Sequence, residues 1–150
     1  MSKIDLKIKK LATNAVMPKY AKPGDAGLDL TAISKIADQF GNLSYGTGLA
    51  VEIPEGYVGL LFPRSSNSKK DLILSNCVGV IDSGYRGELI VKYKKVKVDN
   101  IFFSDNPSYY DIGERVAQLV IVEIPSVTII ETDELSDTER GDGGFGSTGQ

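Results

Sequence analysis

The stretch Val116-Ala117-Gln118-Leu119-Val120-Ile121-Val122-Glu123-Ile124 is a nearly continuous run of β-branched and other apolar residues. A run of this kind is typical of a strand that is covered on both of its faces. Shorter runs of strand-like composition accompany it, and they predict further strands at residues 4–9, 28–31, 57–62, 72–74, 89–93, 101–103 and 127–130. The pattern therefore predicts many short strands at regular spacing.

Turn signals separate these runs, at residues 23–25, 45–48, 54–56 and 105–107. No amphipathic helix longer than about three turns fits the apolar spacing, and residues 66–70 are expected to form one short helical turn. The fold class predicted from this pattern is all-β, and a sandwich, a jelly roll and a barrel all agree with it.

The chain has 150 residues, of which 41% are apolar and 25% are charged. This composition is that of one ordinary globular domain. From about Thr132 onward, Glu, Asp, Ser, Thr and Gly replace the apolar residues, which is typical of a mobile terminus. We therefore expect a β-domain over residues 1–131 and a C-terminal arm over residues 132–150.

The charged and sulfur-containing residues narrow the possible functions. The chain has no histidine, which excludes Ser-His-Asp and Cys-His catalysis and disfavours a zinc site. Its net charge of −3 argues against non-specific nucleic-acid binding. No run has the length to span a bilayer, the N-terminus lacks a signal-peptide pattern, and Cys77 is the single cysteine. We expect no membrane or nucleic-acid partner and a cytoplasmic location, or the cytosol or nucleus of a host if the source is viral.

The glycine-rich segment Arg140-Gly141-Asp142-Gly143-Gly144-Phe145-Gly146-Ser147-Thr148-Gly149 contains Gly-x-Gly-x-x-Gly. No strand–turn–helix context surrounds it, which excludes a Rossmann motif, and no lysine follows Gly146, which excludes a Walker loop. Its backbone N–H groups can still converge on an anion, with Ser147 and Thr148 as hydroxyl donors and Arg140 as a fixed cation. A flexible, non-functional terminus is an equally open alternative.

A second candidate motif covers residues 79–87, Gly-Val-Ile-Asp-Ser-Gly-Tyr-Arg-Gly. Two apolar residues lead to Asp82 in a tight turn, where a carboxylate can act as a general base toward water. Tyr85 offers an aromatic face that can stack on a sugar or a base. An ordinary Asx turn at the tip of a hairpin explains the same pattern, and taken by itself this alternative is favoured.

Three further segments place polar groups beside predicted strands. Arg64, Ser65 and Ser66 follow the strand at 57–62 and suit phosphate oxygens, although a capped short helix also fits them. Arg115 and Gln118 enter a buried strand, so we expect Arg115 to form a structural salt bridge. Asp29 lies in an apolar strand, which is costly unless its carboxylate is paired or near a metal.

Taken together and in order, the motifs at residues 26–30, 63–66, 79–87, 113–119 and 140–149 are similar to the five motifs of the homotrimeric dUTPase family. The resemblance covers nearly the whole chain. It implies a jelly-roll β-barrel that assembles as a homotrimer, with three shared active sites at subunit junctions. It also implies hydrolysis of dUTP to dUMP and pyrophosphate, with Mg²⁺ bound mainly through the substrate phosphates and water.

The resemblance assigns roles to individual residues. Asp82 would activate the water that attacks the α-phosphorus, and Tyr85 would pack under the deoxyribose and exclude a 2′-hydroxyl. Asp29 would act on the metal through water. The remaining substrate-binding positions are Arg64, Ser65, Ser66 and Gln118 for phosphate, Asn76, Gly79, Val80, Ile81 and Ile90 around the uracil, and Arg140, Phe145, Gly146, Ser147 and Thr148 in the lid. Within the lid, Phe145 would stack over uracil, and Arg140, Ser147 and Thr148 would bind the γ-phosphate.

Three departures from the family pattern leave alternatives open. Ser66 stands where the family usually has glycine, residues 67–71 replace a more apolar continuation, and the segment 94–107 is longer than the family's usual hairpin. One alternative function is the related dCTP deaminase, but the position of its catalytic glutamate holds Lys92 here. A second alternative is an interaction protein that binds partners through residues 94–107.

Overall fold

The computed structural model describes residues 3–96 and 108–144, and in this part of the chain the strands form two antiparallel sheets. The five-stranded sheet has the order β1 (Lys7–Lys10), β4 (Asn42–Glu52), β8 (Glu88–Lys95), β6 (Leu72–Leu74), and β3 (Ser34–Ala37) also pairs with β4. The four-stranded sheet has the order β2 (Leu28–Thr31), β9 (Arg115–Glu123), β5 (Tyr57–Phe62), β7 (Gly79–Ile81). A 3-10 helix, η1 (Ser65–Lys69), follows β5.

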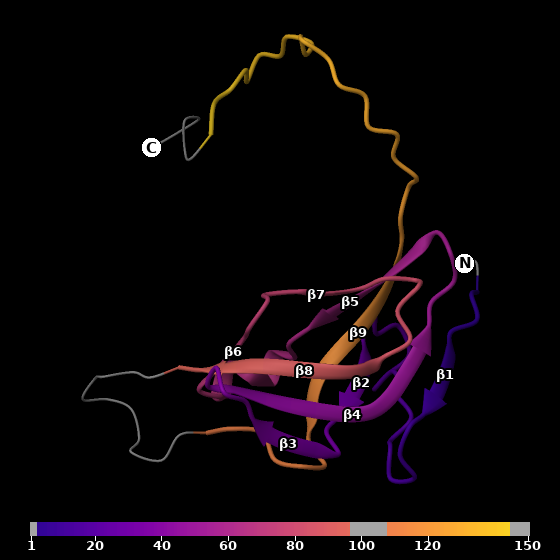
Figure 1. Cartoon of the computed structure of the whole chain (residues 1–150), viewed down its shortest axis with the longest axis vertical. Coiled ribbons are helices and arrows are strands. Elements are labelled where there is room, and N and C mark those ends of the chain that lie inside the picture. The colour runs from indigo at the N-terminus through magenta and orange to yellow at the C-terminus, as the bar shows by residue number, and fades with distance from the viewer. Residues whose placement is uncertain (1–2, 97–107, 145–150) are drawn as a thin grey trace.

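Successive strands repeatedly change sheet, so the two sheets face each other as in a jelly roll (Figure 1). The predicted all-β jelly-roll fold is thus confirmed. Among the described residues, no strand pairing closes the two sheets into one continuous barrel. No helix in the described ranges is long and apolar enough to cross a membrane.

Side-chain alternation on β8 shows how the sheets enclose the core. Leu89, Val91 and Tyr93 are buried between the sheets, whereas Ile90 and Lys92 point outward. The inward residues pack with fully buried side chains from β2, β4 and β9, which are Leu30, Tyr45, Leu49, Val116 and Leu119. Packing in the core therefore holds β8 in place, and the outer face of β8 lines a groove.

Strands appear where the sequence predicts them at β2, β5 and β6, and within a few residues for β1, β8 and β9. The expected helical turn at 66–70 is η1. Strands β3, β4 and β7 were not predicted, and β4 was missed because the glycines at 46 and 48 were interpreted as a turn. The pairing of β4 with β8 is irregular between Gly46 and Ala50, and Gly48 has φ of +66° there. These glycines form a bulge inside a long strand.

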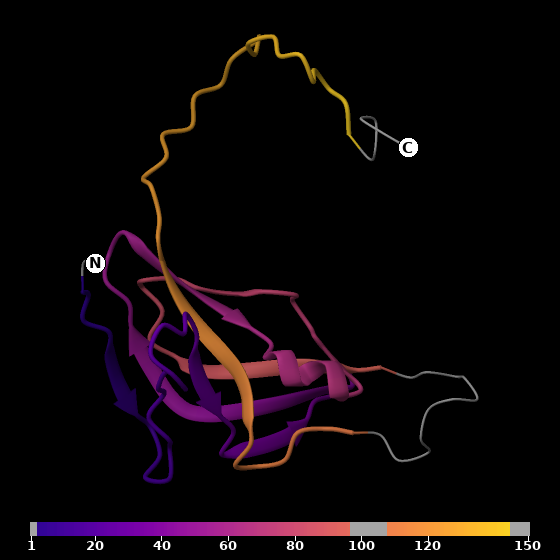
Figure 2. The same ribbon diagram turned by 180° about the vertical axis from the view of Figure 1, so that it is seen from behind.

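The strand predicted at residues 127–130 is wrong for this chain, and the one predicted at 101–103 lies outside the described residues. The segment after β9 leaves the body of the protein, and both views show it standing away from the sheets (Figures 1 and 2). Val127, Ile129 and Ile130 in this segment are 75%, 92% and 78% exposed. β9 itself is covered on both faces only in its first half, because Val122 is 38% exposed. Apolar surface thus remains uncovered in the single chain.

Candidate active site

One groove runs along the outer face of β8. It has a volume of about 470 Å³ and is lined by Ser75, Asn76, Val80, Ile81, Asp82, Tyr85, Glu88, Leu89, Ile90 and Lys92. Five of the uracil- and sugar-side residues expected from the sequence, together with Asp82, are brought together here. The sixth, Gly79, begins β7 beside the Asn76 side chain. The structure therefore gathers the 79–87 motif around one cavity.

The turn after β7 positions Asp82. The Tyr85 N–H donates to the Asp82 carbonyl oxygen at 3.0 Å, and the Arg86 guanidinium donates to the carbonyl oxygens of Ser83 and Tyr85 at 2.6 and 2.9 Å. The predicted turn is formed, and Arg86, which sequence reasoning had not used, holds it. No described residue hydrogen-bonds the Asp82 carboxylate, which leaves it available to a ligand or water.

Tyr85 is held from two sides. Its hydroxyl donates to the Glu88 carbonyl oxygen at 2.9 Å, and its ring lies so close to Gly87 that a Cβ on that residue would collide with the ring. The Glu88 carboxylate accepts from the Gly48 N–H at 2.7 Å, which connects this end of the groove to the β4 bulge. Glu88 was missed by sequence reasoning, although its alternation with Ile90 places both on one face of β8.

A second groove of about 430 Å³ contains the phosphate-side residues. It is lined by Ala21, Asp25, Ala26, Gly27, Asp29, Arg64, Ser65, Gln118 and Val120. Asp29 Oδ1 lies 2.6 Å from Arg64 Nε, and Asp29 Oδ2 lies 2.9 Å from Arg115 Nη1. The expected salt bridge of Arg115 is confirmed, and its partner Asp29 is paired rather than isolated. The largely buried Asp29 carboxylate thereby orients both arginines and offsets one of their two positive charges.

The other phosphate-side residues are fixed by the end of β5. Gln118 Nε2 donates to the Pro63 carbonyl oxygen at 3.0 Å. Arg64 precedes η1 in an extended conformation with no side-chain cap on the helix, so the interpretation of 64–66 as a capped helix is wrong. Ser66 does not line the groove. Its hydroxyl accepts from Arg64 Nη1 at 3.3 Å.

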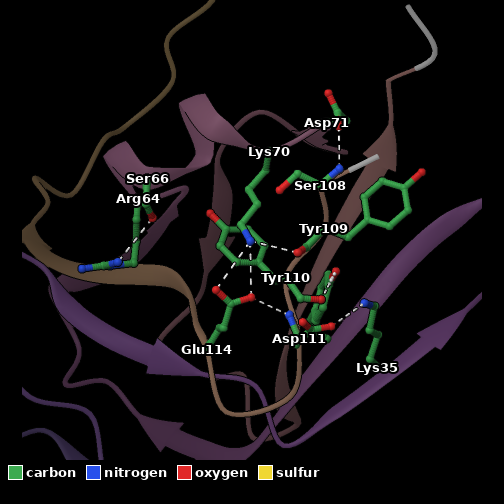
Figure 3. Close-up of polar contacts among 11 residues, drawn as sticks. Lys35, Arg64, Ser66, Lys70, Asp71, Ser108, Tyr109, Tyr110, Asp111 and Glu114 are labelled. Atoms are coloured by element: carbon green, nitrogen blue, oxygen red, sulfur yellow. Dashed lines mark hydrogen bonds and ion pairs between the residues drawn. The ribbon is translucent and has the colours of Figure 1, made fainter. Parts of the chain in front are cut away.

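A polar cluster outside the sequence predictions, centred on Lys70, lies near Arg64 and Ser66 (Figure 3). Lys70 Nζ donates to the Tyr109 carbonyl oxygen at 2.9 Å and lies 4.8 Å from the centre of the Tyr110 ring. Lys70 also pairs with Glu114 at 3.4 Å. These contacts tie the residues after η1 to the segment that leads into β9. No local sequence signal marks them, because the partners are about forty residues apart.

The two grooves share no lining residue. Ile81 is paired with Gly59, so Asp82 follows at the level of Val58, whereas Arg64 lies beyond the opposite end of β5. Six residues of extended chain between these levels correspond to about 20 Å. The structure therefore does not bring Asp82 and Arg64 of one chain together.

Among the C-terminal candidates, the structure describes only Arg140. Arg140 donates from Nε to the Gly143 carbonyl oxygen at 2.9 Å within the exposed arm and lines neither groove. Phe145, Gly146, Ser147 and Thr148 lie outside the described residues.

Within residues 3–96 and 108–144, no group of three or more Asp, Glu or Cys side chains has the arrangement of a metal site. Both oxygens of Asp29 already accept from arginines, so this carboxylate suits a water-mediated contact better than direct ligation. Asp29 therefore fits the indirect metal role that the motif resemblance implies.

Comparison with known proteins assigns this architecture. The dUTPase family model matches residues 13–149. A deoxyuridine 5'-triphosphate nucleotidohydrolase of Hydrogenobaculum sp. (strain Y04AAS1) is 43% identical, over 96% of this chain and 97% of that protein. A variant of the Staphylococcus bacteriophage 80alpha dUTPase, solved with dUpNHpp, is 34% identical with a TM-score of 0.80, covering 97% of this chain and 99% of that one.

A variant of the dUTPase from phage phi11 of S. aureus is 31% identical with a TM-score of 0.70, covering 87% of this chain and 98% of that one. Its structure is described as showing the coordination of a structural Mg(II) ion. Because the family model spans nearly the whole length and the curated relative matches end to end, the chain belongs to the dUTPase family.

Proposed function

We propose that this protein hydrolyses dUTP to dUMP and pyrophosphate. The names of its relatives and the dUpNHpp-bound structure of the phage enzyme support this substrate. The observation that carries the proposal is the position of Asp82, whose carboxylate faces the same groove as Tyr85 and Asn76 and has no hydrogen-bond partner among the described residues. A carboxylate that is free beside a nucleoside-sized groove is suited to accept a proton from water.

In the proposed mechanism, Asp82 accepts a proton from the water that attacks the α-phosphorus, and pyrophosphate leaves. No covalent intermediate on the protein is needed, so the chain's task is to position the reactants and stabilise charge. Arg64, Ser65 and Gln118 bind phosphate oxygens from the second groove. Tyr85 packs against the deoxyribose, where its fixed ring leaves no room for a 2′-hydroxyl.

The separation of the two grooves supports a shared active site. Asp82 and Arg64 of one chain lie about 20 Å apart along β5, which is too far for both to reach one α-phosphate. A homotrimer removes this difficulty if the β8 groove of one subunit meets the Arg64 groove of its neighbour. We therefore propose three active sites, each at a junction between subunits.

The C-terminal arm fits the same assembly. Its apolar residues Val127, Ile129, Ile130 and Leu135 are at least 75% exposed in the single chain, and such surface is normally covered. We propose that the arm packs on neighbouring subunits and brings Arg140, Phe145, Gly146, Ser147 and Thr148 over a neighbour's substrate as a lid. Glycines in the lid would supply N–H donors to phosphate and allow it to reopen.

Magnesium is proposed as the cofactor, bound through the triphosphate, where it neutralises phosphate charge. Asp29 would accept hydrogen bonds from metal-bound water while it holds Arg64. Ser66 takes no direct part in this scheme and accepts a hydrogen bond from Arg64.

The test is turnover of dUTP with Mg²⁺, with dUMP and pyrophosphate measured for the wild type and for Asp82→Asn. We expect turnover in the wild type and a loss of at least about 1,000-fold in the variant. An inactive wild type would contradict the proposal. Ammonia from dCTP would instead indicate a deaminase, which the lysine at position 92 argues against.

A further inference from the structure

Tyr110 is a buried tyrosine in the segment that leads into β9. Its side chain is 1% exposed, and its ring packs against the rings of Tyr45 and Tyr93 at centroid distances of 6.0 and 5.7 Å. Within the described part of the chain, its hydroxyl oxygen reaches full hydrogen-bond geometry with no partner. A buried hydroxyl group is costly when it stays unpaired, so we asked which groups face it.

Two residues from the phosphate side of the candidate site face this hydroxyl. Figure 3 shows the Tyr110 phenol pointing toward Ser66 and Arg64. Burial raises the pKa of Tyr110, whereas the neighbouring Ser66 hydroxyl and the positive charge of Arg64 lower it. Ser66 itself is bonded to Arg64, because its Oγ accepts from Arg64 Nη1 at 3.3 Å. The buried phenol is therefore next to the residue that contacts the proposed phosphate-binding arginine.

The neighbours of Tyr110 determine the direction in which hydrogen bonds can run. Ser66 Oγ accepts from Arg64, so its own proton is free to be donated to Tyr110. On the other side, the Tyr93 hydroxyl donates to the Val116 carbonyl oxygen at 2.7 Å, so its oxygen is free to accept from Tyr110. A guanidinium group only donates and a carbonyl group only accepts. A chain of hydrogen bonds from Arg64 through Tyr110 to the Val116 carbonyl thus has a single possible direction.

The ring of Tyr110 is held in place, so its hydroxyl keeps its orientation. Lys70 Nζ lies 4.8 Å from the centre of the ring and is itself paired with Glu114 at 3.4 Å. The Tyr45 hydroxyl donates to the Tyr110 carbonyl oxygen at 3.1 Å. A buried ring with its backbone fixed in this way provides a rigid support for a neighbouring side chain.

The contact with Ser66 also determines which N–H groups of Arg64 remain for a ligand. A guanidinium group carries five N–H donors in one plane. Asp29 accepts from Nε at 2.6 Å and from Nη2 at 3.5 Å, and Ser66 accepts from Nη1. One N–H on each of the two η nitrogens then remains, which is the number that bidentate binding of phosphate uses. Asp29 holds one edge of the guanidinium group, and Ser66 holds a second point of its plane.

Ser66 stands where the dUTPase family usually has glycine, which has no side chain to offer Arg64, so this contact is a feature of the present chain. We propose that Ser66 and Tyr110 are positioning residues, which hold the Arg64 guanidinium in place for phosphate through a chain of hydrogen bonds that continues into the core. Tyr110 acts by fixing Ser66, and Ser66 acts by fixing Arg64. The inference rests on the proposed function, because it takes Arg64 as a phosphate ligand.

The experiment measures three quantities on the full-length protein: kcat/KM for dUTP with Mg²⁺, affinity for dUpNHpp by calorimetry, and Tm. Ser66→Ala and Tyr110→Phe are each expected to lower kcat/KM and the affinity about tenfold, because Arg64 is held less firmly. The Tm of Tyr110→Phe should not rise, because its hydroxyl is part of the chain of hydrogen bonds and not an unpaired group. Tyr109→Phe removes the neighbouring phenol, which points the other way in Figure 3, and is the matched control that should change neither kcat/KM nor affinity.

Double variants separate positioning from general damage. Arg64→Lys keeps the positive charge but lacks the planar group that Ser66 orients. If Ser66 and Tyr110 act through Arg64, then Ser66→Ala and Tyr110→Phe weaken dUpNHpp binding no further in the Arg64→Lys protein.

Three results would overturn the inference while dUTP turnover by the wild type upholds the proposed function. These are unchanged kcat/KM and affinity in Tyr110→Phe, a rise in its Tm, and an equally large loss of affinity in the Arg64→Lys protein. A wild type without dUTP turnover overturns the proposed function instead, and the inference fails with it.

Discussion

Arg64 Nε lies 2.6 Å from Asp29 Oδ1, and this ion pair joins residues that are 35 positions apart in the sequence. The Asp29 side chain is only 11% exposed and Arg64 is 23% exposed, so little solvent screens the pair. Arg115 Nη1 lies 2.9 Å from the other carboxylate oxygen, Asp29 Oδ2. The arginine proposed to bind phosphate is therefore oriented before any substrate arrives, which is the arrangement that electrostatic catalysis requires.

We expect Asp29→Asn to lower dUTP turnover by about 100-fold, because Arg64 loses the charge that directs it and lies beside an unneutralised Arg115. The matched control is Lys7→Gln, which breaks the exposed pair of Lys7 with Glu52 at the same kind of distance, 2.7 Å. Exposed pairs contribute little, so this control should retain activity. Steady-state kinetics check the prediction, and equal behaviour of the two variants would contradict it.

The separation of Asp82 from Arg64 predicts complementation between two inactive variants. Asp82→Asn and Arg64→Ala should each be inactive alone. When they are co-expressed, a site that takes Asp82 from one subunit and Arg64 from another is intact in about one case in four. Homotrimers contain no intact site, and a trimer that carries both tags contains one intact site in three, so we expect the doubly tagged trimers to recover about a third of wild-type turnover.

The outcome that opposes a shared site is equally definite. If each chain built a complete site, the mixed trimers would contain only damaged sites and would remain inactive. Purification through one tag and then the other provides the control, because only trimers that contain both variants survive both steps, and light scattering then shows that they are trimers.

The contact between Gly87 and the Tyr85 ring predicts a change in sugar selectivity. A Cβ at position 87 would collide with the Tyr85 ring. Gly87→Ala must therefore shift the ring from the position that the hydrogen bond between the Tyr85 hydroxyl and the Glu88 carbonyl oxygen holds. We expect the ratio of kcat/KM for dUTP over UTP to fall at least about tenfold. Gly84→Ala is the control from the same turn, since a Cβ there meets nothing within 4 Å. An unchanged ratio in Gly87→Ala would show that the ring position does not exclude the 2′-hydroxyl.

The sequence predicted the elements whose signal is local. Asp82 and Tyr85 are three residues apart and share one turn, so their common groove follows from the turn itself. β4 escaped prediction because Gly46 and Gly48 resemble a turn. In the structure, Gly46 leaves room for the side chains of Ser34 and Glu88, and the Gly48 N–H finds its acceptor on the Glu88 carboxylate, 40 residues away. Only the pairing of β4 with β8 could have shown this.

The sequence predicted the parts of the candidate site that lie within short motifs, but not the contacts between residues that are far apart in the chain. Hydrogen bonds link Asp38 to Asn42, and Asn42 to Ser75 33 positions later, and none of these residues stands in a recognisable sequence pattern. Likewise, the sequence predicted that Arg115 forms a salt bridge but not with which residue. Its partner is Asp29 because β2 pairs with β9. The exposed apolar arm at 127–130 has strand-like composition without a strand partner in its own chain. Its composition is explained if the partner is a second subunit.

The buried tyrosines predict how stability depends on alkaline pH. Tyr45 is fully buried, donates to the Tyr110 carbonyl oxygen at 3.1 Å, and packs edge-on against Tyr93. Burial raises the pKa of Tyr45 from 10.0 to about 12 and also raises the pKa of Tyr93. The native state thus holds these protons more tightly than the unfolded state. Their contribution to the free energy of unfolding is complete below pH 10 and is lost as the pH rises toward 12.

Tyr45→Phe keeps the ring but leaves the Tyr110 carbonyl without its donor, which should cost about 1 kcal/mol at pH 8. For a chain of this length that corresponds to a fall of about 2–4 °C in Tm. Because one titrating group has been removed, the free energy of unfolding of the variant should also decline less steeply between pH 10 and 12 than that of the wild type. Urea denaturation at a series of pH values measures both effects. Tyr20→Phe, at a ring that is 52% exposed, is the control that should match the wild type throughout. Parallel curves for Tyr45→Phe and the wild type would show that burial of this phenol does not govern the alkaline loss of stability.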